Sequence, residues 1–139
     1  MPSLKTFLIP KHRRYVPGAR QQVRKALADW GVGDELAHSV TLVANELLTN
    51  AVTHCRIPSA RVRVTLTLDD GGLFLEVADP DRDRLPTIHR SRPDEEGGRG
   101  LALVEALADS WGHRQDPYTK CVWARLALTG AEGHVPAGS

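Results

Sequence analysis

Three polar side chains in the segment VANELLTNAVTH are spaced four residues apart: Glu46, Asn50 and His54. Because a helix places residues four apart on one face, this spacing aligns them in one stripe. A carboxylate can take a proton from a hydroxyl, and a carboxamide oxygen one turn away can bind a hard cation. The alternative is a polar helix face turned toward solvent. We interpret His54, near the predicted helix end, as a support for Asn50 rather than a metal ligand.

A glycine cluster, Gly97-Gly98-Arg99-Gly100, directly precedes an apolar helical pattern that begins at Leu101. Glycines let the backbone approach a phosphate closely, and a helix N-terminus offers free N–H groups and the positive end of its dipole. Arg99 can add a charge-assisted contact. The segment has neither the GK[ST] of a Walker A motif nor the preceding strand of a Rossmann turn. It therefore predicts a phosphate site or, alternatively, a hinge without a ligand.

A further carboxylate, Asp79, ends a predicted strand and is followed by Pro80. Proline cannot donate to a strand ladder, so pairing stops at this point. A carboxylate at such an end can accept a hydrogen bond from an exocyclic amine. An ordinary turn aspartate is the alternative.

Hydrophobic spacing predicts the elements that must position these groups. Residues 61–68 alternate strictly between apolar and polar, and Asp69-Asp70-Gly71-Gly72 is typical of a hairpin turn. Asp34 is a candidate N-cap for the helix that carries Glu46. The predicted elements are a strand at 6–9, a helix from Pro17-Gly18 to about 30, a helix at 34–53, strands at 61–68 and 73–78, a helix from 101, a short strand ending at 115 and a strand at 121–128.

The intervening stretch from Asp81 to Gly98 is polar and broken by prolines, and we interpret it as a long mobile loop. Residues 129–139 are interpreted as a frayed tail. We expect one domain over 1–139 with its core at about 17–128. The helices do not alternate with parallel strands. The order therefore predicts an α/β (α+β) two-layer sandwich, with helices on one face of a mixed, mostly antiparallel sheet.

Composition excludes several classes of protein. The 139 residues are 41% apolar and 25% charged, which suits one packed core, and 18 basic against 17 acidic residues give no argument for nucleic acid or an anionic membrane. Cys55 and Cys121 are too few for a disulfide framework and are expected to be buried reduced thiols. No apolar run reaches the length of a membrane span or a signal segment, so a cytoplasmic protein is expected.

The order of these motifs, ELLTNAVTH, a strand ending at Asp79, a loop and then GGRGLALVEALADSWG, resembles the GHKL ATPase superfamily of gyrase, MutL and the histidine kinases. It is most similar to the anti-sigma-factor serine/threonine kinases of Gram-positive bacteria. The resemblance implies a Bergerat-type ATP-binding fold, with ATP and Mg²⁺ as cofactors. The implied roles are Glu46 as general base, Asn50 as Mg²⁺ ligand, Asp79 at the adenine amine, and Gly98, Arg99, Gly100 and Leu101 around the triphosphate, with Thr119 near adenine.

Two motifs depart from the family pattern. The usual Asp-x-Gly is Asp79-Pro80-Asp81 here, which replaces the flexible glycine beside adenine. The usual Gly-Lys-Thr is Thr119-Lys120-Cys121, which places a hydroxyl contact at 121 in doubt and leaves Thr119 to compensate. Neither departure removes the base or the metal ligand.

The resemblance implies an anti-sigma factor that phosphorylates a serine or threonine of an anti-anti-sigma partner of the STAS type and so controls transcription. The partners would be that protein and a sigma factor, without direct contact to nucleic acid or membrane, and a homodimer is expected. Two alternatives stay open at this point. One is a nucleotide-gated protein-binding module with little or no turnover, and the other is a structural domain that binds no nucleotide.

Overall fold

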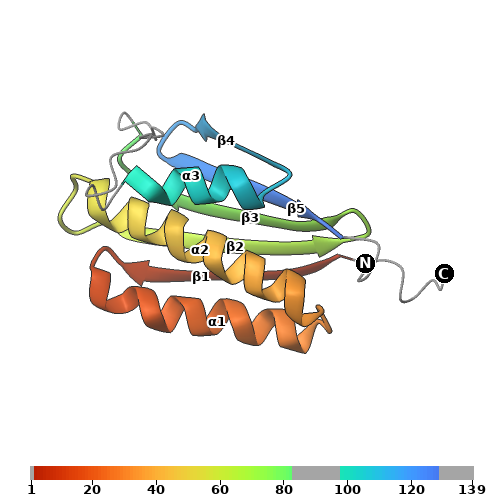
Figure 1. Ribbon diagram of the computed structural model, residues 1–139. Coiled ribbons are helices and arrows are strands. Elements are labelled where there is room, and N and C mark those ends of the chain that lie inside the picture. The colour runs from red at the N-terminus through yellow and green to blue at the C-terminus, as the bar shows by residue number, and fades with distance from the viewer. Residues whose placement is uncertain (1, 83–97, 129–139) are drawn as a thin grey trace.

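The structure, a computed structural model, describes residues 2–82 and 98–128, of which 98–100 are described by backbone only. Five strands and three α-helices make up these ranges (Figure 1). In chain order they are β1 (Ser3–Pro10), the short 3₁₀ helix η1 (Arg13–Tyr15), α1 (Val16–Asp29), α2 (Asp34–His54), β2 (Arg61–Asp69), β3 (Gly72–Asp79), α3 (Gly98–Leu107), β4 (Ser110–Gln115) and β5 (Lys120–Ala127).

The strands form one sheet in the order β1-β2-β3-β5-β4, and every described pairing is antiparallel. The expected mixed sheet is therefore corrected to an antiparallel one. Two helices join β1 to β2, so the chain returns to the end where β1 stopped. The strand β4 does run in the same direction as β3, but β5 lies between them. The two parallel strands, β3 and β4, therefore do not pair with each other.

All three helices cover the same face of the sheet, which gives the predicted two layers (Figure 1). The apolar positions of β2 (Val62, Val64 and Leu66) point into this layer and are fully buried, as strand alternation requires. Against them pack the apolar positions of α2, including Val40, Ala44, Leu47, Leu48 and Ala51. Burial of these side chains is the main source of stability, since each fully buried Val or Leu contributes roughly 1.5–3 kcal/mol.

The hairpin between β2 and β3 has the predicted position, with only Asp70 and Gly71 between the strands. The backbone N–H of Gly71 donates to Oδ1 of Asp69 over 2.8 Å. Gly72 follows with φ +139° and pairs with Ala127 of β5. Only glycine adopts such a φ readily, so this residue fixes how closely β3 approaches β5.

Some boundaries differ from the sequence predictions. The N-cap of α2 is Gly33, so no side chain caps this helix, and Asp34 is its first helical residue. The first strand is longer than predicted because all eight residues of β1 pair with β2. The predicted loop at 81–98 is described only at Asp81, Arg82 and Gly98, and the predicted tail lies outside the described residues. None of the helices in the described ranges has the length and hydrophobicity needed to cross a bilayer.

Candidate functional site

The rotation of α2 places Glu46 and Asn50 on one flank of that helix. α2 lies between α1 and α3 (Figure 1). On the α1 side, Nη1 of Arg20 donates to Oδ1 of Asn45 over 2.7 Å, which fixes the direction in which Asn45 points. Each residue turns a helix by about 100°, so Glu46 and Asn50 face away from α1 and toward the α3 side. Both are half-buried, so the predicted stripe is not a fully solvated face.

Asn45 links Glu46 to α1, a contact that the spacing of polar residues did not indicate. While its amide oxygen accepts from Arg20, its Nδ2 donates to Oε2 of Glu46 over 3.3 Å. The side-chain amide of Asn45 therefore links the guanidinium of Arg20 to the carboxylate of Glu46, the predicted base. This arrangement restricts the Glu46 carboxylate without neutralising it by a direct ion pair in the described part of the chain.

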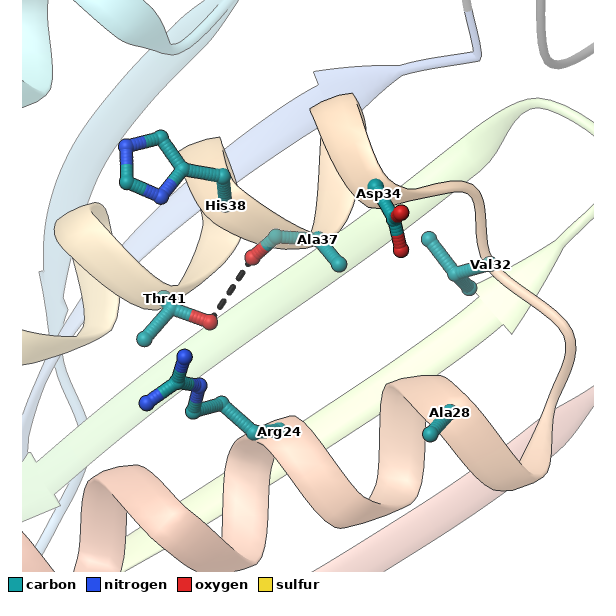
Figure 2. Close-up of a pocket in the computed structure, with 7 residues that line it drawn as sticks. All are labelled: Arg24, Ala28, Val32, Asp34, Ala37, His38 and Thr41. Carbon is teal, nitrogen blue, oxygen red and sulfur yellow. Dashed lines mark hydrogen bonds between the residues drawn. The ribbon is translucent and has the colours of Figure 1, made fainter.

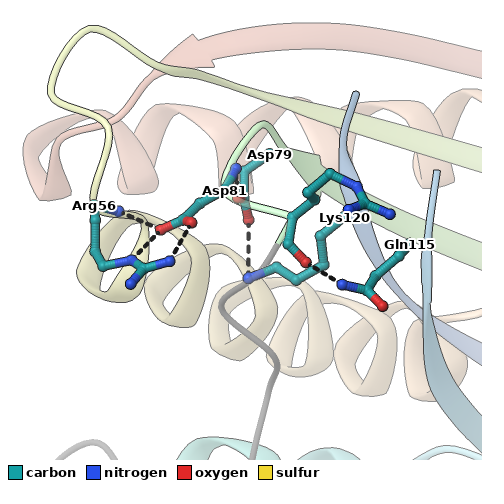
Figure 3. Close-up of polar contacts among 6 residues, drawn as sticks. Arg56, Asp79, Asp81, Gln115 and Lys120 are labelled. Atoms are coloured by element: carbon teal, nitrogen blue, oxygen red, sulfur yellow. Dashed lines mark hydrogen bonds and ion pairs between the residues drawn. The ribbon is translucent and has the colours of Figure 1, made fainter. Parts of the chain in front are cut away.

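Asp79 is the last residue of β3 and is only 2% exposed. Its Oδ1 accepts the backbone N–H of Asp81 over 2.8 Å, and its Oδ2 lies 3.5 Å from Nζ of Lys120 (Figure 3). Burial raises the pKa of Asp79 above its ordinary value, and the charge of Lys120 and the N–H of Asp81 oppose that rise. The predicted carboxylate thus lies at a strand end, but in a dry, paired environment.

A bidentate ion pair brings the C-terminal end of α2 to the end of β3. The guanidinium of Arg56 donates from Nε and Nη2 to the two carboxylate oxygens of Asp81 over 2.9 and 2.8 Å, and the Arg56 backbone N–H adds a third bond of 2.7 Å (Figure 3). Burial raises the pKa of the Cys55 thiol, and the nearby Asp79 and Asp81 carboxylates add to that rise. The end of α2 that follows Asn50 is therefore close to Asp79.

Gly97 of the glycine cluster lies outside the described residues, and the rest of the cluster forms the beginning of α3. Gly98, Arg99 and Gly100 are its first three residues, so the helix starts three residues earlier than the predicted Leu101. The side chain of Leu101 is buried in the hydrophobic core. The side chain of Leu101 therefore cannot contribute to a phosphate site. As the fourth residue of α3, Leu101 also uses its backbone N–H within the helix, and the unpaired N–H groups of the helix N-terminus precede it.

The residue opposite Asp79 across the sheet is Lys120, not Thr119 or Cys121. Thr119 lies in the turn before β5, and its hydroxyl is 3.5 Å from Oδ2 of Asp116. Cys121 points to the helix-free face, because Val122 beside it packs into the core. Burial raises the pKa of Cys121 to about 11, and both cysteines are free and buried, as predicted. The side chain at 121 therefore points away from Asp79, and the lack of a hydroxyl at 121 does not change the surroundings of Asp79.

The sequence from residue 9 to residue 126 matches the family profile described as the histidine kinase-like ATPase domain. The chain belongs to this family. The predicted GHKL membership is confirmed, and it implies that this ATPase domain binds ATP.

Two solved structures share the fold of this ATPase domain. The RsbU and RsbW domains of Rv1364c from Mycobacterium tuberculosis match with a TM-score of 0.69 and 18% identity over 90% of the chain. The histidine kinase domain of the blue-light-activated histidine kinase from Erythrobacter litoralis EL346 matches with a TM-score of 0.54 and 20% identity over 89%. The ATPase domain spans 32% of the first structure and 64% of the second. A comparison with curated proteins gives no significant match.

The donor set suits a magnesium ion that arrives with a nucleotide. No group of three or more His, Cys, Asp or Glu side chains that could hold a metal occurs within residues 2–82 and 98–128. Mg²⁺ in nucleotide sites uses one or two protein oxygens and takes the others from phosphates and water. The amide oxygen of Asn50 beside the Glu46 carboxylate fits that requirement.

A separate pocket of about 410 Å³ lies between α1 and the beginning of α2 (Figure 2). Arg24 and Ala28 line it from α1, and Asp34, His38 and Thr41 line it from α2. The Thr41 hydroxyl donates to the carbonyl of Ala37 over 2.7 Å, a local bond within α2. None of the predicted site residues lines this pocket, and it lies on the α1 side of α2. It is therefore distinct from the candidate ATP site.

The ion pair between Arg56 and Asp81 predicts an acid-sensitive contribution to stability. Hydrogen bonds from Arg56 hold the pKa of Asp81 far below its ordinary value of 3.8. A lowered native pKa stabilises the fold above the unfolded-state pKa, and this stabilisation is lost as the pH falls below it. Asp81→Asn should lower the free energy of unfolding by about 1–2 kcal/mol near pH 7, a modest value because Arg56 is more than half exposed.

Urea unfolding of both proteins between neutral pH and about pH 3 measures this contribution. The difference between wild type and Asp81→Asn should shrink toward the acidic end. Asp29→Asn is the control, because Asp29 pairs with Lys25 on the exposed surface of α1 and should show little effect at any pH. A difference for Asp81→Asn that stays constant across the range would contradict the assignment.

Proposed function

We propose that this ATPase domain is an anti-sigma factor with serine/threonine kinase activity. In this proposal it transfers the γ-phosphate of ATP to a hydroxyl of a small anti-anti-sigma protein of the STAS type, and it binds a sigma factor in the cytoplasm. The similarity in fold to the RsbU and RsbW domains of Rv1364c supports this class of partner. Homodimerisation belongs to the same proposal.

The observation that carries the proposal is the placement of Glu46 and Asn50. Both lie half-buried on the flank of α2 that faces the α3 side, and the end of α2 is tied to the end of β3 where Asp79 lies. An ATPase domain with an acid and an amide in these positions has the groups that phosphoryl transfer requires. These are a proton acceptor, a metal ligand and a binding surface for the nucleotide.

Each side chain has a defined part in the proposed reaction. The Glu46 carboxylate accepts the proton of the attacking hydroxyl, and Asn45 keeps that carboxylate oriented through its 3.3 Å hydrogen bond. The amide oxygen of Asn50 binds the magnesium ion. The N-terminus of α3 offers its unpaired N–H groups to phosphate oxygens. When bound, ATP would supply the phosphoryl group and Mg²⁺ would neutralise the negative charge of the phosphates.

The test is a calorimetric titration with ATP and ADP, with and without Mg²⁺, followed by incubation with radiolabelled ATP and the candidate sigma antagonists of the host. Binding together with phosphate transfer to one partner is the expected result. Binding without transfer to any partner would favour the nucleotide-gated binding module instead. A protein that binds neither nucleotide would contradict both.

Asn50→Ala should weaken ATP binding only when Mg²⁺ is present. The substitution removes one charge-assisted contact to the ion, so a loss of roughly 10-fold to 100-fold in affinity is expected. In the presence of EDTA the variant and the wild type should bind ATP equally, because the remaining contacts do not involve residue 50. An equal loss with and without the metal would show that Asn50 supports the fold and does not bind Mg²⁺.

A further inference from the structure

Lys120 is an unusual lysine because its side chain is only 3% exposed. Lysine is almost never fully buried unless it is paired, since removing an ammonium group from water costs several kcal/mol. Its Nζ lies 3.5 Å from the Asp79 carboxylate, which is itself 2% exposed. The structure thus holds a positive and a negative charge side by side in its interior, at the junction of β3 and β5.

The register of the sheet places this pair at the candidate nucleotide site. Asp79 is the last residue of β3 and Lys120 the first of β5, and the two are direct partners in the antiparallel ladder. Both lie on the same side of their strands as Val77 and Val122, which pack under the helices. The contact of Arg56 with Asp81 brings the end of α2 to the same corner (Figure 3).

Stability alone does not account for a charged pair at this position. Replacing a buried ion pair with apolar side chains of similar volume is often neutral or stabilising. The neighbouring pair in the same layer, Val77 and Val122, is apolar and fits the core. A charged pair in the next position therefore suggests a role in recognition.

The chemistry of the pair matches one edge of adenine. Asp79 supplies an acceptor and Lys120 a donor next to it, whereas the adenine edge presents a donor, the 6-amino group, next to an acceptor, N1. Enzymes that bind a nucleobase commonly recognise it by hydrogen bonds to this edge. The carboxylate has four lone-pair positions, and its contacts within the described residues occupy two of them, so it can also accept from an amine.

We propose that Lys120 determines base specificity together with Asp79, by donating a hydrogen bond to N1 of adenine while Asp79 accepts from the 6-amino group. This inference rests on the proposed ATP site and extends it. The family resemblance implied a role for Asp79 only, and assigned the neighbouring contact to a hydroxyl at 119 or 121. In the structure, the side chain that faces Asp79 is an ammonium group.

Two ATP analogues test this proposal by equilibrium binding, which requires no catalytic turnover. In 1-deaza-ATP the N1 acceptor is replaced by C–H, and purine riboside triphosphate lacks the 6-amino group. Wild type should bind 1-deaza-ATP about 10-fold to 100-fold more weakly than ATP, the effect of one charge-assisted hydrogen bond. Lys120→Met should bind ATP and 1-deaza-ATP equally, and should still prefer ATP over purine riboside triphosphate.

Two further variants keep the test decisive. Lys120→Met leaves the buried Asp79 carboxylate without its cationic partner, so the double variant Asp79→Asn/Lys120→Met provides an uncharged pair if the single variant does not fold. It should also fail to distinguish ATP from 1-deaza-ATP. Lys25→Met, which changes a lysine that is 76% exposed on α1, should behave as wild type.

The outcomes separate this inference from the proposed function. If Lys120→Met and the double variant still bind ATP more tightly than 1-deaza-ATP by the wild-type factor, Lys120 does not contact the base and the inference is overturned while the ATP site stands. Equal binding of the two nucleotides by wild type would overturn it as well. If wild type binds neither nucleotide, the proposed function itself fails and this inference fails with it.

Discussion

Glu46→Gln should reduce phosphate transfer by about 100-fold to 10,000-fold, which is the usual contribution of a general base. Glutamine has nearly the same shape and can still accept the hydrogen bond from Asn45 through its amide oxygen, so the contact with α1 is preserved. Only the capacity to accept a proton is removed. Affinity for Mg²⁺·ATP should therefore remain close to that of wild type.

The measurement is single-turnover transfer to the partner identified by the incubation with radiolabelled ATP, with nucleotide affinity determined in parallel. Glu35→Gln is the matched control, because Glu35 is an exposed acid in the first turn of the same helix and should leave the rate unchanged. If Glu46→Gln transfers phosphate as fast as wild type, Glu46 is not the base. If wild type binds partner and ATP but never transfers phosphate, the alternative of a gated binding module gains support.

Gly72→Ala should destabilise the fold by about 3 kcal/mol or more. A Cβ at this position would lie 2.4 Å from the carbonyl oxygen of Leu126 and 2.7 Å from Cα of Ala127, both of them backbone atoms of the chain that cannot rotate away. The φ of +139° adds a conformational cost of about 1–3 kcal/mol for any residue with a side chain. Separating β3 from β5 would also shift Asp79 relative to Lys120.

Thermal unfolding followed by circular dichroism measures this effect, and a decrease in Tm of roughly 10 °C is expected for a chain of this size. Gly18→Ala is the contrasting control. Gly18 lies in α1 with no atom within 4 Å of its hypothetical Cβ, so alanine there should stabilise the helix by about 0.5–1 kcal/mol. Equal Tm values for Gly72→Ala and wild type would contradict the close approach of the two strands.

Features that depend on local sequence were predicted well. The alternation over 61–68 and the turn at Asp70 and Gly71 determine the hairpin locally, because residues close in sequence set strand pairing across a two-residue turn. The helix that carries Glu46 and Asn50 was likewise evident from its apolar spacing. The N-cap was misplaced by one residue because Asp34, which suits that role, follows a glycine in extended conformation that ends the connection from α1.

Features that depend on distant pairing could not be predicted. Lys120 faces Asp79 only because β5 inserts between β3 and β4 in one particular register, and no local pattern determines that register. The contact of Arg20 with Asn45 depends on how α1 rotates against α2. The pairing of Arg56 with Asp81 likewise requires the ends of α2 and β3 to meet. In each case the residue types were visible in the sequence, but their partners were not.

The boundary between β3 and β5 also has a consequence for the order of assembly. A two-residue turn joins β2 to β3, and a turn closed by the hydrogen bond from the Asp116 N–H to the Thr119 carbonyl joins β4 to β5. Such hairpins form within microseconds, whereas contacts between residues far apart in the chain form later because they close long loops. Asp79 belongs to the first hairpin and Lys120 to the second, so the two residues meet only when β3 pairs with β5. A nucleotide that contacts both would oppose the separation of the two hairpins and so slow the opening of the sheet at its centre.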